Sequence, residues 1–360
     1  MTTAPFSRTA GPGSGREGAP SAIALSPILS ARYRSRDLER IRAAAPGARI
    51  VTVSVEGLAD GPVDDVEVML RGWLSSDAFD RILARAPRLS WVHSATSGVE
   101  RALTTSALER GLVVTNARGV FSRPIAEYVV MMILAVSRRL PQLLELQRER
   151  TWQPLEGAEL RDVTVGIVGL GSIGRAVGAL ATAFGCRVVA VRRRGADEEL
   201  AGPPTEGDGA SDSAVLGEVM LDRVGGPETL PDLLAESDFI VLAAPLTAET
   251  ENMINEETLR LVKPGAWLIN VARGRLVDER ALLRALRDGP LGGAVLDTFR
   301  DEPLPAMSSF YDLPNVIVTP HTAWSSGRVL DRSIELFCDN LGRFARGEPL
   351  LNVVDPAAGY

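Results

Sequence analysis

The segment from 163 to 185, VTVGIVGLGSIGRAVGALATAFG, constrains the fold of this chain more than any other stretch. It contains three glycines in the spacing G-x-G-x-x-G: Gly169, Gly171 and Gly174. An apolar run precedes them, a helix-like run follows, and a second apolar run begins at residue 187. This context predicts a strand, a tight turn and a helix whose first amides, at Ser172 and Ile173, bind the pyrophosphate of a dinucleotide. A glycine-rich turn without a ligand is the alternative, and the strand–helix–strand context disfavours it.

The pattern around this motif predicts an α/β protein with two domains. After residue 160, strand-like and helix-like segments alternate as in a Rossmann doubly wound parallel sheet. The six strand-like segments are 163–169, 187–191, 238–244, 266–271, 292–297 and 315–320. The same alternation between residues 22 and 120 predicts a flavodoxin-like α/β domain that binds the substrate, with the cleft between the two domains.

Two helices set the expected domain boundaries. A long helix at 123–148 follows the first α/β series, and a last helix, near 326–346, is expected to pack back on the first domain. The substrate domain is therefore discontinuous, with residues 22–122 and 325–351, and the NAD(P)-binding domain is 123–324.

Two polar segments are expected to lack a fixed structure. Residues 195–219 are rich in Gly, Asp and Glu and predict a mobile surface insertion. Residues 1–21 are rich in Gly, Pro, Ser and Thr and predict a disordered tail. A transit peptide is a second reading of this tail, but its Pro and Gly content would break the required amphipathic helix. The run at 22–29 could be a weak signal-peptide core; Pro27 interrupts it, and we interpret it as the first strand.

The composition argues against several functional classes. The net charge of −7 disfavours a nucleic-acid partner, which usually requires a basic surface. The longest apolar run, 128–136, is too short to span a membrane. Two cysteines support no disulfide framework and indicate the cytoplasm, and two histidines argue against a His-based metal cluster. These residues are Cys186, Cys338, His93 and His321.

Three arginines, Arg192, Arg193 and Arg194, end the second strand of the Rossmann series. An acidic residue at this place would accept hydrogen bonds from the ribose hydroxyls of NAD and repel a 2′-phosphate. A guanidinium can instead pair with the 2′-phosphate of NADP and stack on the adenine. The sequence therefore predicts NADP(H) over NAD(H), with Arg192 and Arg193 as the contacts; a solvated run of charges is the alternative.

Three residues at the ends of later strands form a candidate reacting centre: Arg273, Glu302 and His321. Next to a nicotinamide, an arginine can hold a 2-oxo acid and polarise its carbonyl, and a histidine can donate a proton as hydride arrives. A carboxylate beside the histidine orients the imidazole and favours its protonated form. Each residue taken alone could be structural, and the role of Glu302 depends on whether the folded chain places it next to His321.

The chain resembles the D-isomer-specific 2-hydroxyacid dehydrogenase family, and within it the glyoxylate/hydroxypyruvate reductase branch most closely. The resemblance spans about residues 50 to 350 and rests on GLGSIG, AAPLTAET, KPGAWLINVARGRLVDE, LDTFRDEPLP and NVIVTPHTAW, in family order. In the first domain, LSWVHSATSGVE is similar to the family's substrate-carboxylate loop, and TNARGVFSRPIAEYVV to its domain-linking helix.

The resemblance implies roles residue by residue. Arg273 matches the substrate-binding arginine, and Glu302 and His321 match the acid/base pair. The backbone at Thr96, Ser97 and Gly98 matches the carboxylate-binding loop. Further cofactor contacts are implied at Ala244, Pro245, Thr250, Val271, Ala272, Asp297 and Ala323, with Asp297 on the nicotinamide side. A dimer formed through the cofactor domain is also implied, with the helix at 123–148 taking part.

We therefore expect an NADP(H)-preferring reductase that converts a small 2-oxo acid of the glyoxylate or hydroxypyruvate type into the D-2-hydroxy acid. One alternative is an NAD-dependent enzyme like phosphoglycerate dehydrogenase, although no regulatory domain follows residue 350. Another is a dinucleotide-sensing corepressor scaffold similar to the C-terminal binding proteins, which keep the same catalytic set. Glu302 disfavours the formate dehydrogenase branch, which has Gln there.

Overall fold

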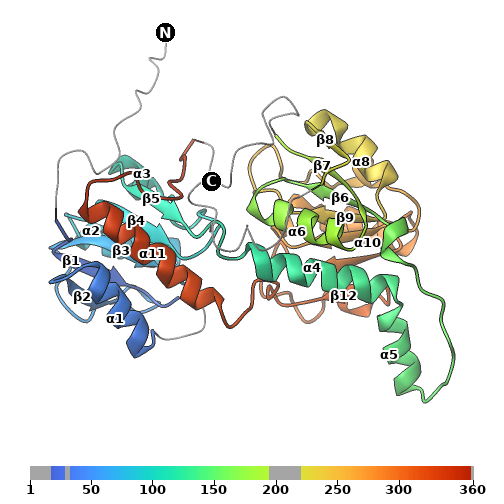
Figure 1. The fold of residues 1–360 in the computed structure, drawn as a ribbon, viewed down its shortest axis with the longest axis horizontal. Coiled ribbons are helices and arrows are strands. Elements are labelled where there is room, and N and C mark those ends of the chain that lie inside the picture. The colour runs from blue at the N-terminus through green and yellow to red at the C-terminus, as the bar shows by residue number, and fades with distance from the viewer. Residues whose placement is uncertain (1–17, 29–32, 194–219, 358–360) are drawn as a thin grey trace, which may run out of the picture. The chain divides into compact units, whose positions relative to one another are not determined.

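The structure, a computed structural model of the chain, describes residues 18–28, 33–193 and 220–357. The expected insertion at 195–219 and Arg194 lie outside these residues, as do residues 1–17 of the expected tail. The chain divides into two compact units. Of the described residues, unit 1 holds those up to Val120 and from Gly327 onward, and unit 2 holds those from Phe121 to Ser326 (Figure 1).

Unit 1 is built on a parallel sheet of five strands in the order β2-β1-β3-β4-β5. In chain order the strands are β1 (Ala22–Leu25), β2 (Arg49–Thr52), β3 (Val66–Arg71), β4 (Trp91–Ser94) and β5 (Val113–Asn116). Its helices are α1 (Ser35–Ala44), α2 (Ser76–Arg85), α3 (Thr105–Glu109) and α11 (Val329–Ala345). This strand order is that of flavodoxin-like sheets, so the predicted fold class of this unit is confirmed.

The C-terminal helix α11 completes the core of unit 1. Its Phe337 and Phe344 lie against Trp91 of β4, with ring centroids 5.6 and 5.5 Å apart. Trp91 and Phe337 are fully buried. Because this apolar face is shared by elements from both ends of the chain, the sheet and α11 form one folding unit.

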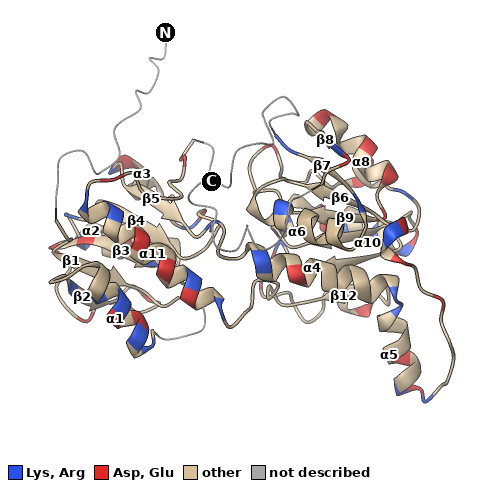
Figure 2. Cartoon of the chain, viewed as in Figure 1, with Lys and Arg blue, Asp and Glu red and all other residues tan. Residues whose placement is uncertain are grey.

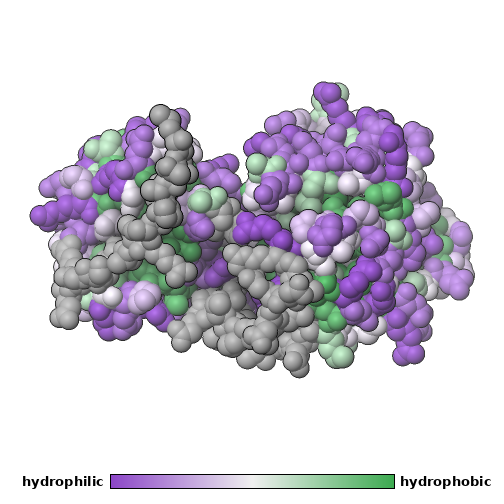
Figure 3. All heavy atoms as spheres, turned by 90° about the horizontal axis from the view of Figure 1, so that it is seen from above, coloured by the Kyte–Doolittle hydropathy of each residue, from purple (hydrophilic) through white to green (hydrophobic). Residues whose placement is uncertain are grey.

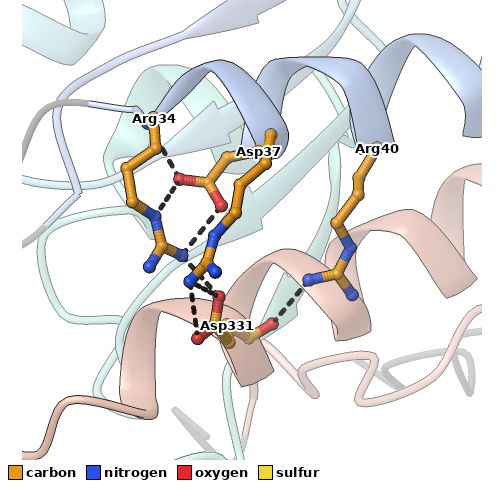
Figure 4. A network of polar contacts seen from close by, with 5 residues as sticks. Arg34, Asp37, Arg40 and Asp331 are labelled. Carbon is orange, nitrogen blue, oxygen red and sulfur yellow. Dashed lines mark hydrogen bonds and ion pairs between the residues drawn. The ribbon is translucent and has the colours of Figure 1, made fainter.

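A polar network also joins α1 to α11 (Figure 4). Arg34 precedes α1 and binds the buried carboxylate of Asp37 with Nε and Nη2, each at 2.8 Å. The Arg34 guanidinium also bonds to Asp331 of α11, and Arg36 contacts the same carboxylate at 2.9 Å. Basic and acidic residues are interspersed along both helices (Figure 2).

Both ends of unit 1 extend past their expected limits. Gly18, placed in the tail by sequence, donates its amide hydrogen to the carbonyl of Ala345 at 2.8 Å, and the Ser21 amide binds Glu67 Oε2 at 2.9 Å. Beyond the expected end at 351, Val353 forms an antiparallel bridge with Thr115. These short pairings depend on tertiary neighbours and leave no periodic signal in the sequence.

Unit 2 is built on a parallel sheet of seven strands in the order β12-β11-β10-β9-β6-β7-β8. In chain order they are β6 (Thr164–Val168), β7 (Arg187–Val191), β8 (Arg223–Gly225), β9 (Phe239–Leu242), β10 (Trp267–Asn270), β11 (Gly293–Leu296) and β12 (Val316–Val318). Its helices are α4 (Ser122–Ser137), α5 (Leu140–Arg148), α6 (Ser172–Ala183), α8 (Leu230–Glu236), α9 (Glu256–Leu259) and α10 (Glu279–Arg287). The predicted Rossmann sheet is confirmed, with one correction: β8 adds a seventh strand, too short to show an apolar period.

The single long helix expected at 123–148 is wrong, because two helices, α4 and α5, occupy this stretch. Arg139 between them has a left-handed backbone, with φ 56°. Pro141 explains the break, since a proline has no amide hydrogen and its ring collides with the carbonyl one turn earlier in a continuous helix.

Hydrophilic side chains cover much of the face of each unit shown in Figure 3. Across the described ranges, no helix combines the length and apolar character needed to cross a membrane. The apolar side chains instead fill the space between each sheet and its helices.

Candidate active site

The residues predicted to bind the cofactor lie at the carboxyl ends of six strands of unit 2. They follow β6, β7, β9, β10, β11 and β12. The chain runs from β6 outward to β7 and β8, then returns to β9 on the other side of β6. Open parallel sheets bind ligands at such a switch point, so this edge is where a dinucleotide is expected.

The glycine-rich turn has the shape of a phosphate cradle. Gly169 has φ 102°, and a Cβ there would meet the amide nitrogen of Ala244 at 2.5 Å. A Cβ on Gly174 would meet the carbonyl oxygen of Gly169 at 2.1 Å, so α6 can approach β6 only without a side chain. At Gly171, by contrast, no atom lies within 4 Å of the Cβ position. Space therefore remains at the N-terminus of α6, where Ser172 and Ile173 begin the helix, and the first amides of a helix are suited to binding an anion.

Further predicted contacts surround this turn. Thr250 Oγ1 donates to the carbonyl of Pro245 at 2.7 Å and accepts from the amide of Thr247 at 2.8 Å. These bonds fold the loop after β9 beside Ala244, which itself touches Gly169. The structure thus brings Ala244 to the glycine turn and ties Thr250 to Pro245, the next residue in the same loop.

Arg192 lies beside the same turn. The Gly169 amide donates to the carbonyl of Val191 at 2.9 Å, and the Arg192 amide donates to the carbonyl of Gly225 at 3.0 Å. The end of β7 is therefore held between the glycine turn and β8. Arg192 is half-buried and Arg193 is exposed.

Glu302 and His321 meet in the structure. Nδ1 of His321 lies 2.8 Å from Oε2 of Glu302, and Oε1 accepts the Phe299 amide hydrogen at 3.0 Å. Burial alone would raise the pKa of Glu302, but the bonds from His321 and Phe299 and the charges of His321 and Arg273 lower it. Glu302 is thus held as a carboxylate that fixes one imidazole nitrogen. About 43% of the His321 side chain is exposed, so the imidazole remains accessible.

Asp297 organises the loop that carries His321. Its main-chain oxygen accepts the His321 amide hydrogen at 2.9 Å. Its buried carboxylate accepts from the amides of Thr322 at 2.8 Å and Ala323 at 3.0 Å. These bonds support His321 in a left-handed conformation, with φ 49°.

Thr319 and Tyr128 extend this arrangement, and sequence reasoning missed both. Thr319 Oγ1 donates to Asp297 Oδ1 at 2.6 Å and pairs with the Tyr128 hydroxyl at 2.7 Å. Burial, with a smaller contribution from the Asp297 charge, raises the pKa of Tyr128 to about 12, despite the bond to Thr319. Tyr128 lies in the apolar run of α4, where the sequence suggested only core packing.

Arg273 follows β10, directly after two further predicted residues, Val271 and Ala272. Its Nη1 donates to the carbonyl of Ala272 at 2.8 Å, and its own carbonyl accepts from Asn270 Nδ2 at 3.0 Å. Asn270 Oδ1 also accepts the amide of Ala272, so this side chain fixes the turn 271–273 after β10. Val271 and Ala272 are buried, whereas Arg273 is half-buried.

The predicted substrate loop, with Thr96, Ser97 and Gly98, lies in unit 1 after β4. The three carbonyls accept, respectively, from the Ala117 amide at 3.2 Å, Asn116 Nδ2 at 3.0 Å and Thr96 Oγ1 at 2.7 Å. The amides of residues 96 to 99 donate to no acceptor among the residues that the structure describes. The loop is half-buried, its carbonyls already accept hydrogen bonds, and its amides have hydrogens left to donate. Such a loop is suited to binding an anion. His93 lies in β4 just before this loop and is fully buried, which is typical of a structural histidine.

Comparison with known proteins identifies the family. The family model described as "D-isomer specific 2-hydroxyacid dehydrogenase, NAD binding domain" matches residues 130–323. A glyoxylate reductase of Korarchaeum cryptofilum is 34% identical over 294 residues, covering 78% of this chain and 81% of the relative.

The chain belongs to the D-isomer specific 2-hydroxyacid dehydrogenase family. The resemblance predicted from the sequence is thus confirmed, and with it the assignment as an NAD(P)-dependent oxidoreductase that acts on CH–OH groups.

Two solved structures are similar to this chain over most of its length. One, from Xanthobacter autotrophicus Py2 in complex with NADPH and MES, has a TM-score of 0.79 and 30% identity, covering 95% of this chain and 100% of that one. The other is an NADPH-dependent glyoxylate/hydroxypyruvate reductase from Sinorhizobium meliloti in complex with NADP and sulfate. Its TM-score is 0.73 at 26% identity, and it covers 94% of this chain and 100% of its own.

Proposed function

We propose that this protein is an NADP(H)-preferring reductase that converts glyoxylate or hydroxypyruvate into the D-2-hydroxy acid. The observation that carries the proposal is the 2.8 Å contact between His321 and Glu302, with the charge of Arg273 acting on the same carboxylate. The similarity to glyoxylate reductases and to an NADPH-dependent glyoxylate/hydroxypyruvate reductase supports this substrate class.

In the proposed mechanism, the bound nicotinamide supplies the hydride that reduces the carbonyl carbon. Arg273 binds the 2-oxo acid and polarises its carbonyl, and the backbone at Thr96, Ser97 and Gly98 binds its carboxylate. His321 gives a proton from Nε2 to the carbonyl oxygen, which becomes the hydroxyl. Glu302, at Nδ1, orients the ring and stabilises its cationic form. Carbon thus gains a hydride and oxygen a proton.

Asp297 and Ala323 would hold the nicotinamide side of the cofactor, and the turn from Gly169 to Gly174 its pyrophosphate. Arg192 and Arg193 would bind a 2′-phosphate. Their position beside the glycine turn supports this role, because the adenine ribose lies at the end of the second strand in such folds. NADPH and NADP in the two similar structures support the same preference.

We also propose a cytoplasmic homodimer. Both cysteines, Cys186 and Cys338, are unpaired, as expected in a reducing compartment. Helix α5 has no buried residue, and Leu140, Leu143 and Leu144 are 45%, 39% and 43% exposed. Trp152, which follows α5, is completely exposed. A second copy of the chain covering these side chains would remove them from water.

The test is the rate of reduced-nicotinamide oxidation with glyoxylate and with hydroxypyruvate, comparing NADPH with NADH. We expect a higher kcat/KM with NADPH. Equal or better use of NADH would contradict the cofactor preference. Tight cofactor binding without turnover of either substrate would favour the corepressor-type scaffold, and size measurement in solution would test the dimer.

A further inference from the structure

Arg71 is a buried arginine at the carboxyl end of β3. Only 3% of the residue is exposed, and its guanidinium lies over the ring of Phe79, with Cζ 5.3 Å from the ring centroid. Burial, with a smaller effect of Arg101, lowers its pKa to about 10, which still leaves it cationic at neutral pH. Among the described residues, no carboxylate forms an ion pair with it. A buried cation without a countercharge is costly and calls for a function.

The contacts of Arg71 enclose the loop after β4. Its main-chain oxygen accepts the amide hydrogen of Ala95 at 2.8 Å, at the start of the loop. Its Nη2 donates to the carbonyl of Arg101 at 2.9 Å, at the end of the loop, and to that of Leu74 at 2.7 Å. One residue thus holds both ends of the segment that carries Thr96, Ser97 and Gly98.

The guanidinium also retains bonding capacity. Its Nε is buried and has no hydrogen-bond partner among the described residues. In β4, Ser94 is paired with Arg71, so the backbone of Arg71 lies at the strand ends from which the loop emerges, and its guanidinium reaches the carbonyl of Arg101 at the end of that loop. The amides of residues 96 to 99 supply donors on the same loop. A positive charge beside free amides is the chemistry that recognises a carboxylate.

We propose that Arg71 is a positioning residue for the substrate carboxylate, which fixes both ends of the loop 95–101 and supplies the positive charge beside its amides. This deepens the proposed function and rests on the role of that loop. Arg71 acts through the loop, because its own surface is almost fully covered. It therefore sets affinity for the acid group and leaves hydride and proton transfer to the residues of unit 2.

Arg110 provides a matched control in the same unit. Its guanidinium also binds main-chain carbonyls, those of Leu83 at 2.6 Å, Ala86 at 2.8 Å and Pro87 at 3.0 Å. These carbonyls precede β4, whereas the loop 95–101 follows it, so Arg110 lies at the opposite edge of the sheet. Arg110→Met removes a similar set of bonds without touching the loop.

The experiment compares Arg71→Met, Arg71→Lys and Arg110→Met with the wild type. In Arg71→Met, we expect the KM for glyoxylate and the dissociation constant of oxalate, a carboxylate probe that is not reduced, to rise about tenfold or more. The kcat should change less than about threefold, and the dissociation constant of NADPH should not change. Arg71→Lys keeps the charge without the planar fork, so its values should lie between these limits.

Three outcomes would overturn the proposal: an unchanged oxalate affinity in folded Arg71→Met, an equal loss in Arg110→Met, or a loss of kcat without a change in KM. If Arg71→Met does not fold, an unchanged oxalate affinity in Arg71→Lys would overturn it. Calorimetric binding of oxalate needs no turnover. A wild type that binds oxalate but reduces no 2-oxo acid would therefore refute the proposed function and leave the role of Arg71 testable, whereas one that binds no oxalate would refute both.

Discussion

Nδ1 of His321 lies 2.8 Å from Oε2 of Glu302, although the two residues follow different strands, β12 and β11. Adjacent parallel strands bring their carboxyl ends together, so residues 19 apart in sequence become a hydrogen-bonded pair. Because Nδ1 is engaged by Glu302, the proposed mechanism assigns proton transfer to Nε2.

Replacing His321 with Ala should lower kcat by about 10²- to 10⁴-fold, because the proposed proton donor is lost. The dissociation constant of NADPH, measured by fluorescence titration, should stay within about twofold. In the proposed mechanism the imidazole acts only in the transition state, so its loss should not change the affinity for the cofactor. A variant that keeps near-normal turnover would remove His321 from the mechanism.

Glu302→Gln should lower kcat by about tenfold or more, because a neutral amide cannot stabilise the imidazolium as a carboxylate does. KM should change little. Steady-state kinetics at saturating NADPH would measure both, and a rise in KM at constant kcat would show that Glu302 binds substrate instead.

Tyr128→Phe should lower kcat by about fivefold, the equivalent of one hydrogen bond of about 1 kcal/mol. The Tyr128 hydroxyl binds Thr319, and Thr319 binds the carboxylate that anchors the His321 loop. The matched control is Tyr33→Phe, which loses a bond of 2.6 Å to the Ser26 carbonyl in unit 1 and should keep its kcat. Equal effects of both substitutions on kcat would argue against a specific role.

Arg192→Ala should raise the KM for NADPH by about tenfold and leave the KM for NADH nearly unchanged, because only NADPH carries the 2′-phosphate. Arg187, at the start of the same strand, provides the control: its Nη1 pairs with Glu236 at 2.6 Å. Arg187→Ala should affect neither KM. If Arg192→Ala weakens both cofactors equally, the arginine does not read the phosphate.

His93 should make stability depend on pH. Burial lowers its pKa from 6.5 to about 3, so the folded state keeps it neutral while the unfolded chain takes up a proton below about pH 6.5. The contribution of neutral His93 to the free energy of unfolding is complete above pH 6.5. It is lost as the pH falls toward 3, by up to about 1.4 kcal/mol per pH unit.

Urea unfolding of wild type and His93→Asn at pH 7 and pH 5 would measure this effect. Between pH 7 and pH 5, the free energy of unfolding should fall less in His93→Asn than in the wild type. Identical slopes in wild type and His93→Asn would contradict the assignment.

The sequence by itself determined the two α/β units, because apolar periodicity and glycine spacing are local properties. Gly174 is required by contacts within one strand–turn–helix unit, with Gly169 and Ile167. Gly169 has a positive φ of 102° in the turn itself, and a Cβ there would also meet Ala244 in the loop after β9. The residues at strand ends were predictable for the same reason, since parallel strands place them at one edge.

Tertiary structure alone decided how those residues act. The pairing of Glu302 with His321, and the bonds from Tyr128 to Thr319 and from Thr319 to Asp297, join segments that no short pattern relates. In the sequence Arg71 is one arginine at the end of a strand; in the fold it binds both ends of a loop and loses its hydration. These contacts are decided by long-range burial and hydrogen bonding. Both depend on which strands become neighbours in the fold, and the composition of a single strand does not reveal that.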